Sequence, residues 1–249
     1  MNDMPSRFSL EGGRGLLLIA ARKPAPGMAK TRLGATIGMA DAAALYAAFL
    51  VDLAARFTPC QDEDWGFDVG WAFTPADVDF ATVLQRIGCN PPSPAMRFVA
   101  QYGDGWDVRQ TNILAWSHEQ GYERTVLIGS DSPQLPFTVI SDAFVALVEH
   151  DVTLGRTLDG GYYLIGMRQF HDVLSGVPMS TDSAADALVA RIKNLGLRLA
   201  ELPVTFDIDE EHDLERLRRA LAPDGDPAPA TWAALRRLEL SEPVPGSSV

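Results

Sequence analysis

A cluster of basic residues follows the first apolar run of the chain, residues 16–19, which predicts a buried strand. Residues 22–32 hold four cations: Arg22, Lys23, Lys30 and Arg32. Two prolines stiffen this segment, and Gly27 lets its backbone approach a ligand closely. Because the chain carries a formal charge of -12, such a cluster indicates a site for a more acidic group, such as a diphosphate. A solvated surface loop is the alternative, but nucleotides bind at the carboxyl ends of strands in open α/β sheets.

An aspartate follows a second apolar run, residues 125–128. Gly129 and Ser130 end this predicted strand, and Asp131 comes next. Mg²⁺ prefers carboxylate oxygens together with phosphate oxygens, so Asp131 is a candidate metal ligand. The alternative is that Asp131 or Ser132 caps the helix that follows Pro136.

Two further aspartates, Asp207 and Asp209, alternate around an apolar residue. In an extended segment they share one face, where two carboxylates repel each other unless a cation or hydrogen-bond donors lie between them. The alternative is an acidic helix start, because Asp209 is followed by Glu210, Glu211 and Asp213 and a helix dipole favours acids there.

Two glycine-containing segments are candidate ligand loops. Asp159 precedes Gly160 and Gly161, where it could bind sugar hydroxyls or act as a base, although Asp-Gly-Gly is also a plain turn signal. The loop from Gln101 to Arg109 links a strand to a helix and is a weaker candidate for contacts with a base, a ribose or an acceptor.

Composition describes a globular α/β protein with a sizeable core: 249 residues, 47% hydrophobic and 22% charged. The acidic net charge argues against nucleic acid or an anionic membrane as the main partner. With two cysteines and no visible secretory signal, we expect a cytoplasmic protein. The oligomeric state is left open.

The order of elements predicts a three-layer α/β/α sandwich with a mostly parallel sheet, because strands alternate with helices. Strands are expected at residues 16–20, 67–73, 96–100, 125–128, 152–154, 162–167 and 197–202. Helices are expected at residues 40–57, 76–87, 108–119, 139–149, 182–195, 210–221 and 231–240. Residues 155–161 suggest a hairpin. The expected organisation is a flexible N-terminus (1–14), a nucleotide-binding transferase domain (15–221), a linker (222–230), and a short helix with a disordered tail (231–249).

Taken in order, four motifs of residues 16–219 resemble a known family. They are the basic loop 23–33, Ile-Gly-Ser-Asp-Ser-Pro at 128–133, Asp-Gly-Gly-Tyr-Tyr at 159–163, and Asp-Ile-Asp at 207–209 followed by Asp213-Leu214. The chain resembles bacterial glycosyltransferase-A-like proteins, formerly a domain of unknown function, some of which are named arsenosugar-biosynthesis glycosyltransferases. The same Rossmann-like fold houses sugar-nucleotide pyrophosphorylases, molybdopterin guanylyltransferases and phospholactate guanylyltransferases.

The resemblance implies a nucleotide-diphospho-sugar transferase fold that uses Mg²⁺ or Mn²⁺. It implies that the basic loop holds nucleotide phosphates through Lys23, Gly27, Lys30 and Arg32, beside Arg22. Asp131 matches the first metal ligand and Asp209 the second, although Glu210 stands where a threonine is usual. The helix entrance at 106–108 departs from the family pattern, so the roles of Gln101 in nucleotide binding and Arg109 in substrate binding are open.

Three functions are compatible with these residues. In a metal-dependent glycosyltransferase, Asp159 is the catalytic residue, Gly160 and Gly161 contact the substrate, and the partners are a nucleotide sugar and a small-molecule acceptor. A guanylyltransferase-like nucleotidyltransferase would take a nucleoside triphosphate and a phosphorylated small molecule. A non-catalytic nucleotide-binding protein is the third possibility.

Overall fold

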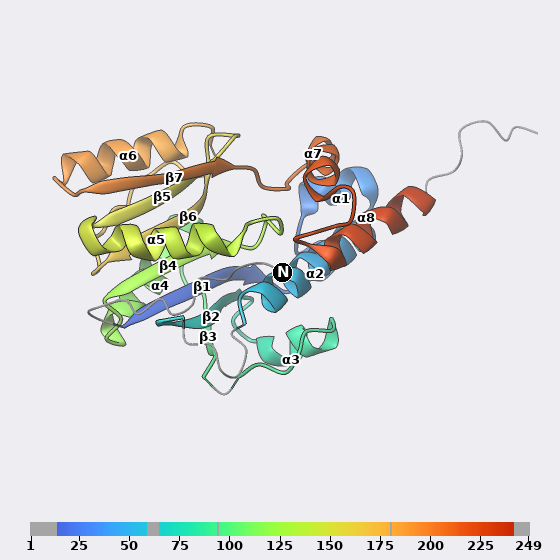
Figure 1. Ribbon diagram of the computed structural model, residues 1–249, viewed down its shortest axis with the longest axis horizontal. Helices are drawn as coiled ribbons and strands as arrows, with labels where there is room; N and C mark the ends of the chain where they lie inside the picture. The colour runs from blue at the N-terminus through green and yellow to red at the C-terminus, as the bar shows by residue number, and fades with distance from the viewer. Residues whose placement is uncertain (1–13, 59–64, 94, 180, 242–249) are drawn as a thin grey trace, which may run out of the picture.

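The computed structural model describes residues 14–58, 65–93, 95–179 and 181–241 (Figure 1). The expected flexible N-terminus, except for Arg14, and the expected disordered tail from residue 242 onward lie outside these residues. The strands are β1 (Gly15–Arg22), β2 (Phe67–Thr74), β3 (Arg97–Ala100), β4 (Arg124–Gly129), β5 (Val152–Thr157), β6 (Tyr162–Arg168) and β7 (Leu199–Thr205). Each of them matches an expected strand.

Eight helices are described: α1 (Thr31–Ile37), α2 (Met39–Arg56), α3 (Phe80–Arg86), α4 (Trp106–Glu119), α5 (Phe137–Glu149), α6 (Ala184–Asn194), α7 (Glu211–Leu221) and α8 (Pro229–Ser241). All but α1 were expected. Helix α1 has seven residues and ends at Gly38 with φ 94°, so it is too short to show a helical repeat of apolar residues in the sequence.

The strands form one mixed sheet in the order β3-β2-β1-β4-β6-β5-β7. Strand β1 pairs in parallel with β2 and β4, β2 with β3, and β5 with β7. Strand β6 runs antiparallel to both β4 and β5, so residues 155–161 do form the predicted hairpin. The mostly parallel α/β architecture is confirmed.

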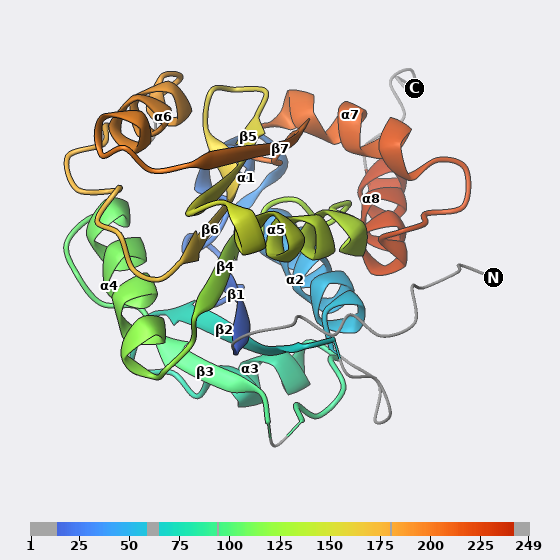
Figure 2. The ribbon, with the colours of Figure 1, turned by 60° about the vertical axis from the view of Figure 1, so that its left-hand side comes forward.

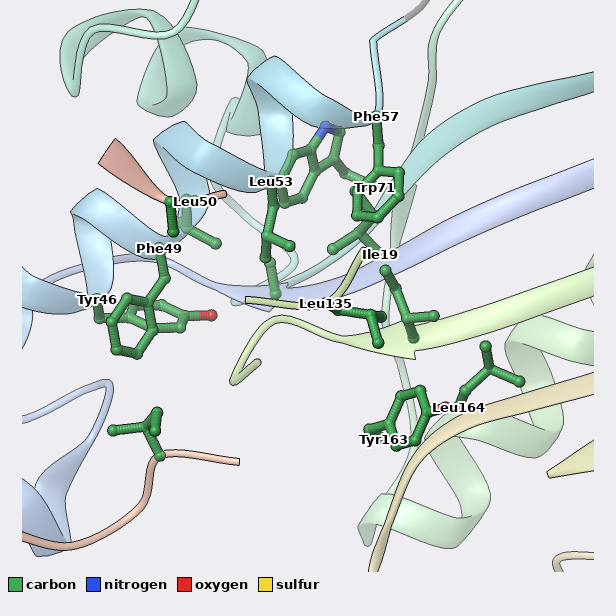
Figure 3. Close-up of a cluster of buried hydrophobic side chains, with 14 of the residues drawn as sticks. Ile19, Tyr46, Phe49, Leu50, Leu53, Phe57, Trp71, Leu135, Tyr163 and Leu164 are labelled. Carbon is green, nitrogen blue, oxygen red and sulfur yellow. The ribbon is translucent and has the colours of Figure 1, made fainter. Parts of the chain in front are cut away.

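Both faces of the sheet are covered by helices, because the central strands are apolar on both sides. Along β1, Leu17 and Ile19 enter one core cluster, whereas Leu16 and Leu18 enter the other. Helices α2, α5, α7 and α8 contribute to the first cluster, and α4 and α6 to the second. Figure 3 shows part of the first cluster, where Leu53 of α2 lies beside Trp71 of β2 and Leu135 lies close to Ile19 of β1.

Helix α8 packs along α2, as Figures 1 and 2 both show. Asp52 of α2 is buried, and its carboxylate accepts hydrogen bonds from the backbone N–H groups of Ala230 (2.9 Å) and Thr231 (2.7 Å). Arg56 of the same helix donates to the carbonyl of Pro227. Side chains of α2 therefore anchor the start of α8 at the end of the segment expected to be a linker.

We expect Asp52→Ala to lower the free energy of unfolding by about 1–2 kcal/mol, the usual cost of losing a helix cap. The two N–H groups at the start of α8 would lose their acceptors. Urea denaturation would measure the change, with Asp142→Ala at an exposed position on α5 as the control. Equal midpoints for the two variants would show that α8 docks without this contact.

Candidate functional site

A cleft of about 540 Å³ opens where β1 and β4 end, β6 begins, and the chain leaves β7. The carboxyl ends of parallel strands share one edge of a sheet, so loops far apart in sequence converge there. Eight of the residues predicted from the sequence line the cleft: Arg22, Lys30, Arg32, Gln101, Asp131, Asp159, Gly161 and Asp209.

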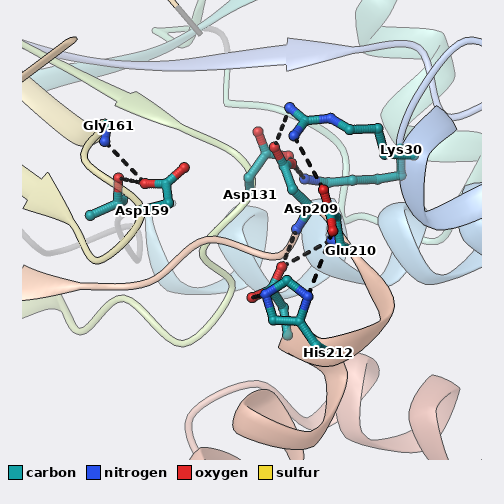
Figure 4. A network of polar contacts seen from close by, with 10 residues as sticks. Lys30, Asp131, Asp159, Gly161, Asp209, Glu210 and His212 are labelled. Carbon is teal, nitrogen blue, oxygen red and sulfur yellow. Dashed lines mark hydrogen bonds and ion pairs between the residues drawn. The ribbon is translucent and has the colours of Figure 1, made fainter. Parts of the chain in front are cut away.

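The most connected group in the cleft is the ammonium of Lys30 (Figure 4). Its Nζ atom lies 2.5 Å from Oδ1 of Asp131 and 2.9 Å from Oδ1 of Asp209. Nη2 of Arg32 lies 2.9 Å from Oδ2 of Asp209. The Lys30 side chain is 4% exposed, whereas that of Arg32 is 66% exposed. The two predicted metal ligands are thus joined through one buried cation.

These contacts govern the charges in the cluster. Burial alone would lower the pKa of Lys30, but the carboxylates of Asp131 and Asp209 raise it above its ordinary value. Burial alone would raise the pKa of Asp209, but Lys30 and Arg32 lower it. Lys30 and Asp209 are therefore both charged at neutral pH.

The backbone around Lys30 is well anchored. Lys30 has φ 52° and immediately precedes α1, and its carbonyl accepts a hydrogen bond from the N–H of Gly34 at 2.7 Å. The preceding residue, Ala29, is buried. The Lys30 side chain therefore extends into the cleft from a backbone that is bonded to the first turn of α1.

The acidic residues after β7 were interpreted either as a helix start or as carboxylates that face a cation, and the structure assigns each interpretation to different residues. The side chains of Glu210 and Asp213 form a capping box at the start of α7, and Asp213 also accepts a hydrogen bond from the N–H of Asp209. Asp209 stands before the helix, and its carboxylate points to Lys30 and Arg32. The acidic helix start and the cleft carboxylate are therefore different residues.

Neither Asp131 nor Ser132 caps α5, so that alternative is wrong. The residue at the N-cap is Pro136, and no side chain caps that helix. The hydroxyl of Ser132 donates instead to the carbonyl of Phe206, and the N–H of Ile208 donates to the carbonyl of Asp131. These bonds hold the loops after β4 and β7 together, which brings Asp131 close to Asp209.

Asp207 also lines the cleft. Burial and the charges of Asp159, Asp209 and Asp131 raise its pKa to about 7, against the opposing effect of Lys30. The alternation in the sequence made both Asp207 and Asp209 candidates to face a cation. The contacts with Lys30 and Arg32 belong to Asp209.

Asp159 lies in the hairpin turn, away from the Lys30 cluster (Figure 4). Its Oδ1 accepts hydrogen bonds from Oγ1 of Thr157 at 2.5 Å and from the N–H of Gly161 at 3.0 Å. Within the ranges that the structure describes, no hydrogen bond reaches Oδ2. The carboxylate is thus oriented through Oδ1.

Four of the predicted residues do not line the cleft: Lys23, Gly27, Gly160 and Arg109. Gly27 adopts φ 74° in the turn before α1. Gly160 faces another segment of the chain, because a Cβ atom there would lie 1.8 Å from the carbonyl oxygen of Asp182. Nε of Arg109 donates to the carbonyl of Gly105. Roles of these residues in ligand binding remain predictions.

Sequence reasoning missed a buried pair behind the basic loop. The hydroxyl of Tyr46 lies 2.7 Å from that of Ser130 and accepts a hydrogen bond from the N–H of Arg22. Burial, with a smaller contribution from Asp131, raises the pKa of Tyr46 to about 12. The pattern of α2 shows that Tyr46 is buried, but the partner of its hydroxyl lies 84 residues away.

A second missed group, centred on Tyr162, also lines the cleft. Gln110 Nε2 donates to the hydroxyl of Tyr162 at 2.8 Å, and that hydroxyl lies 3.5 Å from Sδ of Met179. Trp106, Thr181 and Asp182 line the same cleft. A buried glutamine in a helix and the aromatic pair after Gly161 are the available sequence signals.

The side chains of the cleft bear more negative than positive charge. Three cations line it, Arg22, Lys30 and Arg32. Five carboxylates line it, Asp131, Asp159, Asp182, Asp207 and Asp209. No group of three acidic, cysteine or histidine side chains in the described ranges is arranged to hold a metal ion unaided. Asp131 and Asp209 supply the oxygen ligands that Mg²⁺ and Mn²⁺ favour, so the residues fit a metal whose other ligands are phosphate and water.

The comparisons with known proteins agree with this picture. The family described as "Uncharacterized protein conserved in bacteria (DUF2064)" matches residues 72–181. A crystal structure of a candidate nucleotide-diphospho-sugar transferase from Desulfovibrio desulfuricans G20 has a TM-score of 0.80 and 29% identity. The match covers 91% of this chain and 95% of that chain. No protein with a curated description matches.

More distant structures share the fold. A cytidylyltransferase from Leptospira borgpetersenii serovar Hardjo-bovis has a TM-score of 0.52 at 10% identity, over 92% of this chain and 95% of that one. A CMP:2-keto-3-deoxy-manno-octonic acid synthetase complexed with CTP has a TM-score of 0.51 at 14% identity, over 84% and 98%. In the described part of this chain, no helix is both long and apolar enough to cross a membrane. The predicted resemblance is thus confirmed: the chain matches this bacterial family over residues 72–181 and has the nucleotide-diphospho-sugar transferase fold.

Proposed function

We propose that this protein is a metal-dependent glycosyltransferase that uses a nucleotide-diphospho-sugar donor. The observation that carries the proposal is the cluster of Lys30, Asp131 and Asp209 at the carboxyl ends of the strands, beside Arg22 and Arg32. A diphosphate alone would meet more carboxylates than cations in this cleft, so a nucleotide accompanied by a divalent cation is the better match.

Each residue has a defined task in this proposal. Asp131 and Asp209 would hold Mg²⁺ or Mn²⁺, which when bound offsets the negative charge of the diphosphate. Arg22 and Arg32 bind phosphate oxygens through charge-assisted hydrogen bonds. Arg32 is well placed for this because its guanidinium is largely exposed. Gln101 donates to the carbonyl of Ala72 at 2.6 Å and shapes the floor of the cleft.

Asp159 is the proposed general base, acting through Oδ2. It accepts the proton of the acceptor hydroxyl as the acceptor oxygen bonds to the anomeric carbon of the sugar. The bond from that carbon to the phosphate oxygen breaks, and the nucleoside diphosphate leaves with its electron pair. The bonds from Thr157 and Gly161 to Oδ1 hold the carboxylate in position during this step.

The distribution of charge favours an acceptor without a phosphate group. Gly160, next to Asp159, approaches the carbonyl of Asp182, and the hydroxyl of Tyr162 lies beside Gln110 and Met179. A phosphorylated acceptor would face carboxylates there. Small hydroxyl compounds without a phosphate fit this part of the cleft.

The protein is proposed to act in the cytoplasm, because a chain of this length with two cysteines is typical of a reducing compartment.

Nucleotidyl transfer is the second candidate. It is favoured by the presence of Arg22, Lys30 and Arg32 in one cleft, where they could contact a triphosphate. The fold shared with a synthetase complexed with CTP and with a cytidylyltransferase is compatible with it.

A thermal-shift panel of nucleotide sugars and nucleoside triphosphates, each with and without Mn²⁺, tests both candidates. We expect the largest rise in melting temperature with a nucleotide sugar and Mn²⁺ together, because ligands that bind the folded state stabilise it. A larger shift with a triphosphate would favour nucleotidyl transfer. The absence of a shift with every compound would leave neither activity supported.

A further inference from the structure

Both carboxylate oxygens of Asp209 have a cationic partner. Its Oδ1 bonds Nζ of Lys30 at 2.9 Å, and its Oδ2 bonds Nη2 of Arg32 at 2.9 Å. Oδ1 of Asp131 bonds the same ammonium at 2.5 Å. A divalent cation that takes Asp209 as a ligand must therefore displace one of these cations or lie directly beside it.

Like charges at such separations repel strongly, above all where little water screens them. The Lys30 side chain is almost fully buried, so water cannot screen this repulsion for its ammonium as it can for the exposed guanidinium of Arg32. Without the two carboxylates, the buried ammonium would need another anion. A phosphate group entering the cleft is such an anion, and rotation of the long Lys30 side chain is sufficient to turn the ammonium towards it while the backbone keeps its bond to Gly34.

We propose that the Lys30 ammonium is a resident cation of the Asp131–Asp209 pair and is exchanged for the divalent metal when a diphosphate enters. Lys30 then passes from the carboxylates to the phosphate oxygens as the metal takes its place. This inference rests on the proposed function, and it adds that metal and nucleotide bind as a coupled pair. Each raises the affinity for the other by the same factor, as linkage requires.

The first test measures the affinity for Mn²⁺ in the absence of any nucleotide. Electron paramagnetic resonance of the free ion gives this affinity for wild type, Lys30→Met and Lys30→Gln. We expect the Lys30 variants to bind Mn²⁺ at least tenfold more tightly than wild type, because the competing charge is gone. Lys193→Met, at an exposed position on α6, is the matched control and should leave the affinity unchanged. Unchanged or weaker Mn²⁺ binding by both Lys30 variants would overturn the proposal, since Lys30 would then act only to hold the carboxylates together.

The second test uses inorganic pyrophosphate as a probe that does not depend on the identity of the base. Calorimetry on wild type should show that pyrophosphate binds at least tenfold more tightly with Mn²⁺ than without it. This measurement uses wild type only, so it does not depend on whether a variant folds. Lys30→Gln should keep the coupling that comes from direct contact between metal and phosphate and lose the part that the exchange adds, so its coupling factor should be smaller than that of wild type. Wild type that binds Mn²⁺ equally well with and without pyrophosphate would also overturn the exchange.

The outcomes separate this inference from the proposed function. If nucleotide sugars stabilise wild type with Mn²⁺ but the Lys30 variants gain no Mn²⁺ affinity, the function stands and the exchange is refuted. If the Lys30 variants gain Mn²⁺ affinity but no nucleotide, nucleotide sugar or pyrophosphate binds, the proposed function fails, and with it the coupling to a diphosphate.

Discussion

Asp131→Asn should abolish Mn²⁺-dependent nucleotide binding, lowering the affinity at least a hundredfold, which corresponds to about 2.8 kcal/mol. The substitution preserves the shape of the side chain but removes the charge that a divalent cation needs. Lys30 keeps its bond to Asp209, so the loop before α1 stays anchored. We therefore expect a folded protein with a melting temperature close to that of wild type in the absence of ligand.

Calorimetry with a nucleotide sugar that stabilises wild type, in the presence and absence of Mn²⁺, would measure this effect. Asp142→Asn, on the exposed side of α5, changes the net charge equally and should bind as wild type does. If Asp131→Asn retains its metal-dependent affinity, Asp131 is not a metal ligand, and its contact with Lys30 has a structural role only.

Gly160→Ala should lower the free energy of unfolding by about 2–5 kcal/mol. This figure is the sum of two costs: a left-handed backbone conformation for a residue with a Cβ atom, and the steric overlap of that atom with its neighbours. Gly160 has φ 90°, and a Cβ atom would lie 1.8 Å from the carbonyl oxygen and 2.4 Å from the carbonyl carbon of Asp182. Backbone atoms cannot turn aside as the end of a flexible side chain can. The segment before α6, which lines the cleft through Thr181 and Asp182, would have to shift.

Gly176→Ala is the matched control for this change. Gly176 also has a positive φ, 79°, but a Cβ atom there would meet nothing within 4 Å. We expect this control to cost about 1–2 kcal/mol, from the backbone conformation alone. Urea denaturation of both variants isolates the contact with Asp182, and equal losses of stability would show that the segment yields without cost.

Local patterns in the sequence were sufficient to predict the elements of the fold. Continuous apolar runs such as that of β1, which is buried on both faces, and the alternation of strands with helices predicted the covered sheet. The short connection between β5 and β6 predicted the hairpin. The sequence indicated a basic loop after β1 and a candidate metal ligand after β4, and Lys30 and Asp131 of these segments meet in the structure. These predictions depend on backbone propensity and burial, which are properties of consecutive residues.

Other features depended on the approach of distant segments. Lys30 and Asp209 are 179 residues apart, and nothing in either local pattern indicates that one ammonium would join both predicted metal ligands. Gly160 illustrates the same limit, because its sequence suggests space for a ligand, whereas the backbone of Asp182 fills that space. The sequence alone determined which elements form and which charged residues follow them. Only the tertiary structure decided which charges pair, because pairing depends on how loops from separate strands pack against each other at the edge of the sheet.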